Sequence, residues 1–167
     1  MKILIAPQKI LSTPTQPVEQ FDAELKDLVN QMEETLKNQH DPEGVGLSAN
    51  QVGVPLRVAV VRLNYEDPRT SARFIAVVNP QITRSSPQST EEYEGCLSLP
   101  HQYALVSRAA GVTVEAQDLQ GNPIKLTPQG FLARIFQHEI DHLNGKLITD
   151  RARGKVLTEE EFQKLVT

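Results

Sequence analysis

Residues 137–142 read Gln-His-Glu-Ile-Asp-His, which places two imidazoles four positions apart with a glutamate beside the first. In a helix, four residues rise about 6 Å and return to the same face, so His138 and His142 can share one metal ion. Glu139 can then reach a water molecule at that ion. The same HExxH pattern is a signature of zinc-dependent proteases. The segment therefore predicts metal-assisted hydrolysis.

The residues around this segment predict a buried helix. Thr127 is a good N-cap, Pro128 suits the first helical position, and Gly145 lies where helices commonly end. Between them, apolar side chains recur at helical spacing, at positions 131, 132, 135, 136, 140 and 143. Histidines on such a helix need partners, because unsatisfied polar groups are costly in an apolar core. Hydrogen-bonded core histidines are the alternative, but HExxH on a buried helix favours metal ligands.

A catalytic metal usually takes three protein ligands and keeps one position open for water. The only cysteine, Cys96, is the candidate for the third ligand, although a lone cysteine is often a small buried hydrophobic residue. A thiolate with two imidazoles suits iron(II), zinc, nickel or cobalt and excludes calcium and magnesium. One cysteine forms no internal disulfide, and Pro7 interrupts the opening residues before a signal peptide develops. We therefore expect a reducing, cytoplasmic location.

A third segment, residues 44–51, reads Gly-Val-Gly-Leu-Ser-Ala-Asn-Gln. Two glycines among small residues indicate backbone that packs closely against another group. The segment is not a P-loop, because no Gly-Lys-Ser/Thr follows, and its spacing does not fit a dinucleotide-binding fingerprint. Alone, it assigns no function.

Together, the three segments resemble the three motifs of the peptide deformylase family, which are a glycine-rich GxGLAAxQ segment, EGCLS and QHExDH. Here they read GVGLSANQ, EGCLS and QHEIDH, in the family's order and at similar separations. The opening ILIAPQKILSTPTQPV and the stretch FLARIFQHEIDHLNGKLITDR are also similar to the family. The resemblance thus extends from Met1 to about Arg151.

The resemblance implies a role for each matching position. Glu139 would be the general base and acid, and Gln51 with the backbone N–H of Leu97 would stabilise the oxyanion. The metal ligands would be Cys96, His138 and His142. The implied reaction removes the formyl group from N-formylmethionine at the start of newly made polypeptides. The family's usual metal is iron(II), one per chain, and nickel, cobalt or zinc can substitute.

Candidate substrate contacts lie around this site. Three residues before His138 share its helix face and can wall an apolar pocket for methionine: Phe131, Arg134 and Ile135. Phe131 and Ile135 can equally be plain core residues. Arg134 can contribute its aliphatic stem while its guanidinium reaches solvent. The glycine-rich segment can pair with an extended peptide through its backbone. The full set is Val45, Gly46, Gly95, Phe131, Arg134 and Ile135.

Metal-bound histidines usually donate their second N–H to a carboxylate or carbonyl group. Glu94 and Asp141 are nearby candidates in sequence, and Arg108 can neutralise one of them. Structural salt bridges explain these residues equally well. His40 and His101 lie in polar, loop-like surroundings, and we expect both to be ordinary surface residues.

The remaining chain predicts an α+β fold, with antiparallel sheets packed around the central metal-bearing helix. Its 167 residues suit one domain, residues 1–167, with a short tail from about 154. An amphipathic helix is expected over residues 21–36, strands over 56–63, 74–82, 111–119 and 124–126, and polar loops over 64–72 and 85–90. The net charge of −4 disfavours direct nucleic-acid binding, and no apolar run is long enough for a membrane span.

Three departures from the family pattern bear on function. Ser48 stands where the family usually has alanine, and Tyr103 stands where some members have an arginine that touches substrate. In the tail, Thr158 and Glu161 form a capping box that starts a short acidic helix, which suits ribosomal RNA poorly. We expect N-formylmethionyl peptides and nascent chains as partners, with transient ribosome proximity only. A zinc metallopeptidase and a non-catalytic metal-binding relative are the alternatives.

Overall fold

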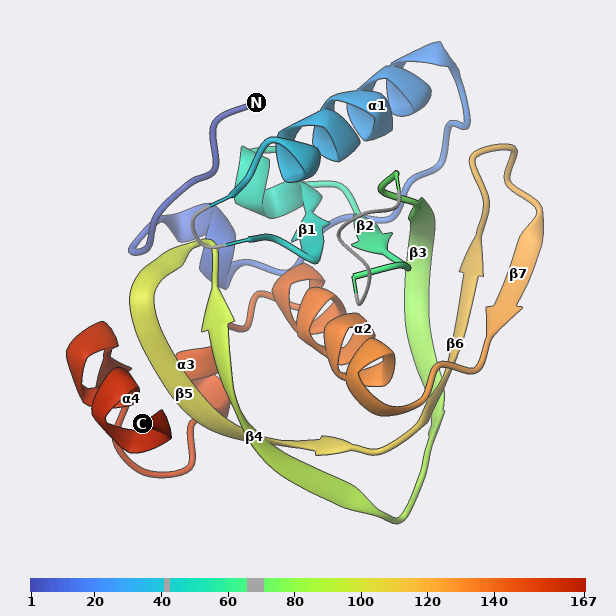
Figure 1. The fold of residues 1–167 in the computed structure, drawn as a ribbon. Helices are drawn as coiled ribbons and strands as arrows, with labels where there is room; N and C mark the ends of the chain where they lie inside the picture. The colour runs from blue at the N-terminus through green and yellow to red at the C-terminus, as the bar shows by residue number, and fades with distance from the viewer. Residues whose placement is uncertain (41–42, 66–70) are drawn as a thin grey trace.

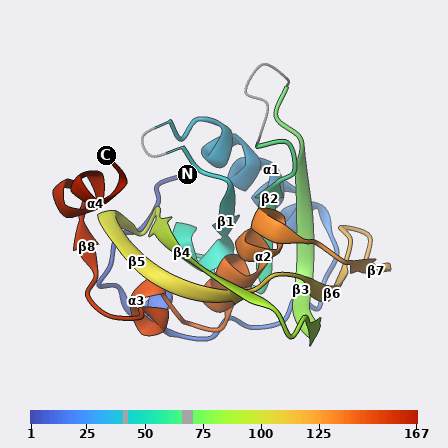
Figure 2. The same cartoon turned by 60° about the horizontal axis from the view of Figure 1, so that its bottom comes forward.

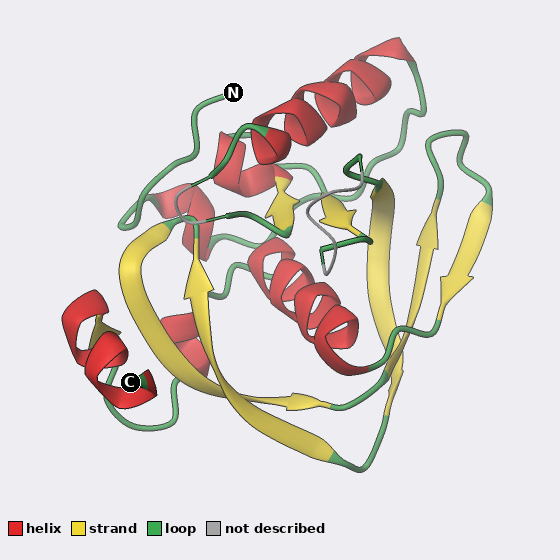
Figure 3. Cartoon of the chain, in the orientation of Figure 1, coloured by secondary structure: helices red, strands yellow, loops and turns green. Residues whose placement is uncertain are grey.

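The computed structural model of the protein describes residues 1–40, 43–65 and 71–167. Its strands form two antiparallel sheets, which confirms the expected α+β class (Figure 1, Figure 3). The first sheet has five strands in the order β1-β2-β3-β6-β7, which are Gly46–Ser48, Val58–Arg62, Phe74–Ser85, Val112–Gln117 and Pro123–Leu126. The second has the order β4-β5-β8, which are Ser89–Cys96, Leu99–Ala109 and Leu157–Thr158.

In the part of the chain that the structure describes, four α-helices and two short 3₁₀ helices accompany the sheets. In chain order they are η1 (Lys9–Ser12), α1 (Ala23–Lys37), η2 (Ala49–Val52), α2 (Gly130–Leu143), α3 (Ile148–Arg151) and α4 (Glu159–Val166). Helix α2 lies in the space between the two sheets, and α1 lies on the far side of β1 and β2 (Figure 1). The segment with the two histidines is therefore central. No helix within the described ranges is both long enough and apolar enough to cross a membrane.

Strand β2 explains how the first sheet holds α1 on one face and α2 on the other. Successive side chains of a strand point to opposite faces. Val58 and Val60 pack in the cluster formed with α1, whereas Ala59 and Val61 pack in the cluster formed with α2. All four are fully buried, so this strand has a continuous apolar sequence, as expected for a strand covered on both faces.

Helix α2 begins two residues later than the sequence predicted. Gln129 is its N-cap, and the expected cap, Thr127, lies outside the helix. The reason is that this segment still belongs to the sheet: the carbonyl of Pro128 accepts a hydrogen bond from Val112, and the N–H of Gly130 donates to Ala110. At the other end, Gly145 adopts a positive φ of 71° directly after the cap, as predicted.

The predicted helix over residues 21–36 and the four predicted strands are all present, but the short strands β1 and β8 and the longer strands β4 and β5 were missed. Strands β4 and β5 form a long hairpin in which Glu94 pairs with Ala104 and Gly95 with Tyr103. Strands β3 and β4 also extend into the predicted loop over 85–90 and leave only residues 86–88 to connect them. The other predicted loop, 64–72, includes residues 66–70, which lie outside the described ranges.

Candidate metal centre and active site

Three side chains with metal-binding atoms meet at the centre of the fold. Cys96 is the last residue of β4, whereas His138 and His142 lie one turn apart on α2. Nε2 of His142 lies 3.3 Å from Sγ of Cys96 and 3.1 Å from Nε2 of His138. All three ligand atoms lie within 4.8 Å of one another, and this is the one such group within the described ranges. The structure thus brings the three predicted ligands together.

The donor set and its spacing fit a divalent transition metal. Bonds of about 2.1 Å to nitrogen and 2.3 Å to sulfur, at tetrahedral angles, separate neighbouring ligand atoms by about 3.4–3.6 Å. The observed nitrogen and sulfur separations are close to this range. Burial lowers the pKa of His142 well below its ordinary value and so favours the neutral imidazole, which is the form that binds metals. Two imidazoles and a thiolate suit iron(II), nickel, cobalt or zinc.

Glu94 orients the first histidine. Its Oε2 lies 3.1 Å from Nδ1 of His138, which leaves Nε2 of that ring to face Cys96 and His142. Arg108 holds Glu94 in turn through two hydrogen bonds of 2.9 Å, one to each carboxylate oxygen. Burial disfavours the charged carboxylate, but the hydrogen bonds from His138 and Arg108 outweigh it and hold the pKa of Glu94 well below its usual range.

Asp141, the other predicted partner for a histidine, has a different role. Its carboxylate accepts hydrogen bonds from Arg108 and Arg151. The salt-bridge alternative is therefore the correct one for Asp141. Arg108 binds both carboxylates, so a buried ionic cluster runs from His138 through Glu94 and Arg108 to Asp141. This cluster is a rigid support for the ligand face of α2.

Glu139 lies beside the ligands with one oxygen unengaged. Its side chain is 3% exposed, and Oε2 makes no hydrogen bond. Burial raises the pKa of Glu139 to about 7, near the range in which a carboxylate can both accept and donate a proton. The backbone of Gly46 packs directly on this carboxylate, and a β-carbon at that position would lie 2.8 Å from Cδ of Glu139. The glycine-rich segment is thus needed for close approach to the base.

Gln51 presents its amide nitrogen to the site. Nε2 donates to Oγ of Ser98 at 3.2 Å and lies 3.9 Å from Sγ of Cys96. Ser48 and Ser98, which hold the amide, were not predicted as site residues. The sequence did carry a signal for Ser48, because Ser-Ala-Asn-Gln matches the S-x-x-Q form of a capping box, in which the fourth residue reaches back to the first.

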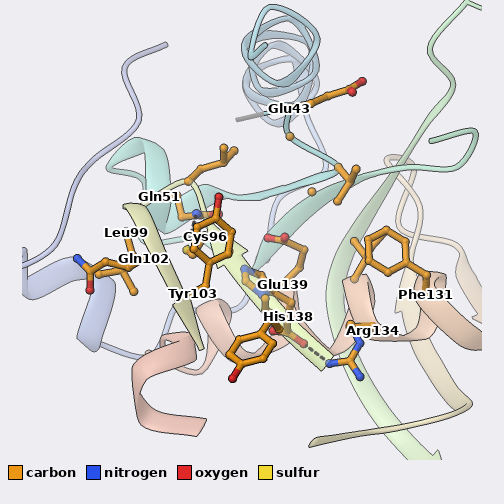
Figure 4. Close-up of a pocket in the computed structure, with 18 of the residues that line it drawn as sticks. Glu43, Gln51, Cys96, Leu99, Gln102, Tyr103, Phe131, Arg134, His138 and Glu139 are labelled. Atoms are coloured by element: carbon orange, nitrogen blue, oxygen red, sulfur yellow. Dashed lines mark hydrogen bonds and ion pairs between the residues drawn. The ribbon is translucent and has the colours of Figure 1, made fainter. Parts of the chain in front are cut away.

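A pocket of about 290 Å³ opens onto these groups (Figure 4). Its walls combine two strand edges with α2: Gly46 comes from β1, Gly95 from β4 and Ile135 from α2. Gln51, Cys96, His138 and Glu139 lie toward its centre in Figure 4, with Phe131 to one side and Gln102 to the other. Leu97, in the turn after β4, also lines the pocket.

All six candidate substrate contacts line this pocket, in differing surroundings. Phe131 is 44% exposed and contacts Tyr65 edge to face, so it is not a core residue. Ile135 is buried within the core cluster beneath α2. Arg134 does not reach solvent as expected: it is 4% exposed, and its guanidinium donates to Glu94 at 2.7 Å. That carboxylate is the nearest strong acceptor, which explains the inward turn.

The other two histidines are exposed, as expected. His40 forms an isolated β-bridge with Glu43 after α1. His101 lies at the rim of the pocket, with Nδ1 3.8 Å from a carboxylate oxygen of Glu159. His101 is therefore both exposed and part of the lining of the pocket.

Comparisons with known proteins agree with this geometry. A sequence model of the family described as polypeptide deformylase matches residues 1–157. The chain is 39% identical over 166 residues to the peptide deformylase of Aquifex aeolicus and covers 95% of it, with 98% of this chain aligned. It is also similar to the solved peptide deformylase structure from Thermotoga maritima, with a TM-score of 0.82, 35% identity, and 92% and 97% of the two chains covered.

A second solved structure, the peptide deformylase from Legionella pneumophila, has a TM-score of 0.81 and 41% identity. The match covers 99% of this chain and 94% of the other. The likeness therefore extends over both sheets and the helix between them. On sequence, fold and the arrangement of the pocket, the chain belongs to the peptide deformylase family.

Proposed function

We propose that this enzyme releases formate from N-formylmethionyl peptides with Glu139 as the proton carrier. Deformylation is the activity of the family to which the chain belongs. The observation that carries the assignment of roles is one juxtaposition. A buried carboxylate with one unpartnered oxygen lines the same pocket as a side-chain amide and two of the three metal-binding side chains, Cys96 and His138. Those are the parts that hydrolysis of an amide needs.

Cys96, His138 and His142 would hold the metal ion, which when bound would acidify water and polarise the formyl oxygen. Glu139 takes a proton from the attacking water as the new C–O bond forms at the formyl carbon. Glu139 then delivers that proton to the nitrogen as the C–N bond breaks. The second proton of the water leaves the new carboxylic acid and is taken up by the released amine. The products are therefore a formate anion and an N-terminal ammonium group, so atoms and charge balance.

Negative charge develops on the formyl oxygen during the attack. Nε2 of Gln51 and the backbone N–H of Leu97 are proposed to donate hydrogen bonds to it. Support comes from the position of Gln51, whose amide nitrogen is held near Cys96. Removing one such donor typically lowers the rate by about 10²–10³.

The extended peptide is proposed to bind between two strand edges. β1 lies at one edge of the first sheet and β4 at one edge of the second, and both border the pocket. Val45 and Gly46 on one side and Gly95 on the other can pair with a peptide backbone with little demand on its side chains. The methionine side chain would enter the apolar part of the pocket near Phe131 and Ile135, above the stem of Arg134.

The native metal is proposed to be iron(II), one ion per chain, with nickel, cobalt or zinc able to replace it. The thiolate and imidazole donors support this group of metals. Nascent chains are the natural source of formylated N-termini, so we place the enzyme in the cytoplasm, in transient proximity to ribosomes. A single thiol ligand that must stay reduced is consistent with that compartment.

The two alternative functions fit the site less well. In zinc peptidases the third ligand usually follows the HExxH helix, whereas the metal-binding group found within the described ranges takes Cys96, which precedes it. A non-catalytic relative would have no use for the buried Glu139 or for an oriented Gln51, and both are present in the pocket.

The test is formate release from a short N-formyl-methionyl peptide by protein purified without oxygen. Glu139→Gln is the matched control, because it keeps the size of the side chain and removes the base. We expect rapid release that falls by about 10²–10⁴ in the variant with metal content unchanged. No release by metal-loaded wild-type protein would overturn the proposal, and full activity of the variant would overturn the role of Glu139.

A further inference from the structure

The C-terminal helix α4 folds back onto the hairpin that carries Cys96. It follows β8, whose residue Leu157 pairs with Tyr103 on β5 (Figure 2). The ring of Phe162, on α4, stacks on the ring of Tyr103 with centroids 4.1 Å apart and planes 11° apart. Phe162 also contacts Tyr93 on β4, at 5.6 Å between centroids. One residue of the tail therefore touches aromatic rings on both strands of the hairpin.

A second contact fixes the same tyrosine. The hydroxyl of Tyr103 donates a hydrogen bond of 2.7 Å to Oε2 of Glu159, the first residue of α4. Stacking restrains the plane of the ring, and the hydrogen bond restrains its rotation about the stack. The Cε1 atom of the same ring lies near Gly95, where a β-carbon would be 3.4 Å from it. The ring therefore contacts the tail and also lies against the backbone of the pocket wall.

Tyr93 and Tyr103 both line the pocket that Cys96, His138 and Glu139 also line. They do so next to Gly95, which immediately precedes Cys96. A peptide whose formyl group lies at Cys96 and whose backbone follows β4 would carry its later residues past these two rings. Aromatic faces there favour apolar and aromatic side chains of those residues.

We propose that α4 is part of the active-site wall: Phe162 and Glu159 hold Tyr103 in place, so that Tyr103 and Tyr93 form an aromatic subsite for peptide residues beyond the formylated methionine. The inference rests on the proposed function. Phe162 is a positioning residue, since it acts through Tyr103. The consequence is selectivity for chain length and for apolar residues after methionine, set by the tail of the chain.

The test compares two substrates, formyl-Met-amide and formyl-Met-Ala-Phe, on the full-length, metal-loaded enzyme. Phe162→Ala should raise KM for the longer substrate about five- to ten-fold and leave its kcat within about two-fold. For the short substrate both constants should stay within about two-fold of wild type. Phe162→Tyr, which keeps the ring, should restore the wild-type KM. Leu165→Ala is the matched control, because this side chain lies on the same helix and is 58% exposed.

A second variant keeps the inference testable if Phe162→Ala unfolds α4. Tyr103→Leu removes the proposed subsite ring itself and should give the same split between the two substrates. Equal loss on both substrates, or no change in KM for the longer one in either variant, would overturn the inference while leaving deformylation intact. Absence of formate release from both substrates by the wild-type enzyme would instead overturn the proposed function, so the two failures are distinguishable.

Discussion

Oε1 of Gln51 accepts two hydrogen bonds from Ser48, one from the hydroxyl at 2.9 Å and one from the backbone N–H at 3.0 Å. A carboxamide with its oxygen fixed has its nitrogen fixed as well. Nε2 is therefore directed toward Ser98 and Cys96, where it can meet a developing oxyanion. Ser48 is fully buried, so its hydroxyl has a defined partner rather than water.

Replacing Ser48 by alanine should lower kcat about three- to ten-fold, because one of two bonds to Oε1 is lost and the amide gains freedom. KM should change little. In Gln51→Ala, kcat should fall about 10²–10³. The double variant provides the control: once Gln51 is absent, Ser48→Ala should cost nothing more, as measured by steady-state kinetics. Additive losses would show that Ser48 acts on something other than Gln51.

Gly46→Ala should damage the active site without unfolding the protein. The new β-carbon would lie 2.8 Å from Cδ and 2.9 Å from Cγ of Glu139, so the carboxylate must move. A displacement of about 1 Å in a reacting group can lower the rate about 100-fold. Gly95→Ala is the comparison, because its β-carbon would make a contact of 3.4 Å with the ring of Tyr103 and should cost less than ten-fold. Similar kcat values for the two variants would contradict this.

The buried ionic cluster should make the free energy of unfolding depend on pH in the acidic range. The pKa of Glu94 in the folded protein lies below its ordinary value of 4.5, so its contribution is complete above about pH 4.5 and is lost as the pH falls below that value. We expect the contribution of Glu94 to Tm to be constant above about pH 5 and to be lost at lower pH, whereas the raised pKa of Glu139 stabilises the folded protein as the pH falls from about 7 toward 4.5.

Glu94→Gln tests this dependence, measured by thermal unfolding across the same pH range. The variant should be about 3–5 kcal/mol less stable at neutral pH, because Arg108 and Arg134 lose a shared buried partner. Its Tm should also fall less steeply in acid. Glu115→Gln, which disrupts an exposed pair with Lys125, is the control and should change stability by less than about 1 kcal/mol. An acid transition unchanged in Glu94→Gln would argue against the cluster.

Metal removal should abolish activity reversibly. A chelator should stop formate release, and iron(II) or nickel added without oxygen should restore it, because three side chains alone provide no Lewis acid. In air, the iron form should lose activity over time as iron and the Cys96 thiolate are oxidised, whereas the nickel form should persist. Activity assays of both forms under air and under nitrogen, with metal content measured in parallel, check this. Equal decay of the two forms would point to a cause other than the metal.

The metal-binding group could be predicted because its chemistry is local. Helical spacing alone places His138 and His142 on one face, and Cys96 was the only thiol available. The hairpin that carries Cys96 could not be predicted as easily. Its inward-facing positions include Glu94 and Arg108, two charged residues that are buried only because they neutralise each other. In β5, the buried side chains alternate along the strand at Ala104, Val106 and Arg108. Because the third of these is charged, the sequence does not show the alternation of apolar and polar residues that predicts a strand.

Contacts between segments that lie far apart in the chain could also not be predicted from the sequence. The helix face of Arg134 was predictable, but not the turn of its guanidinium toward Glu94 on another element. In the tail, Thr158 and Glu161 predicted a helix that begins with a capping box, and α4 has that capping box. Nothing in its eight residues indicated that Phe162 would stack on Tyr103, because that contact depends on how the chain returns past β5.

Cys96 is the only cysteine of the chain, and it is buried at the metal-binding group. A thiol-reactive dye therefore has one target, with no background from other cysteines. Cys96 also lines the pocket, so a dye small enough to enter the pocket would label it only in molecules that have lost their metal, since a coordinated thiolate is shielded. Labelling of Cys96 thus measures the metal occupancy of the enzyme directly, with one thiol per site and without any substrate.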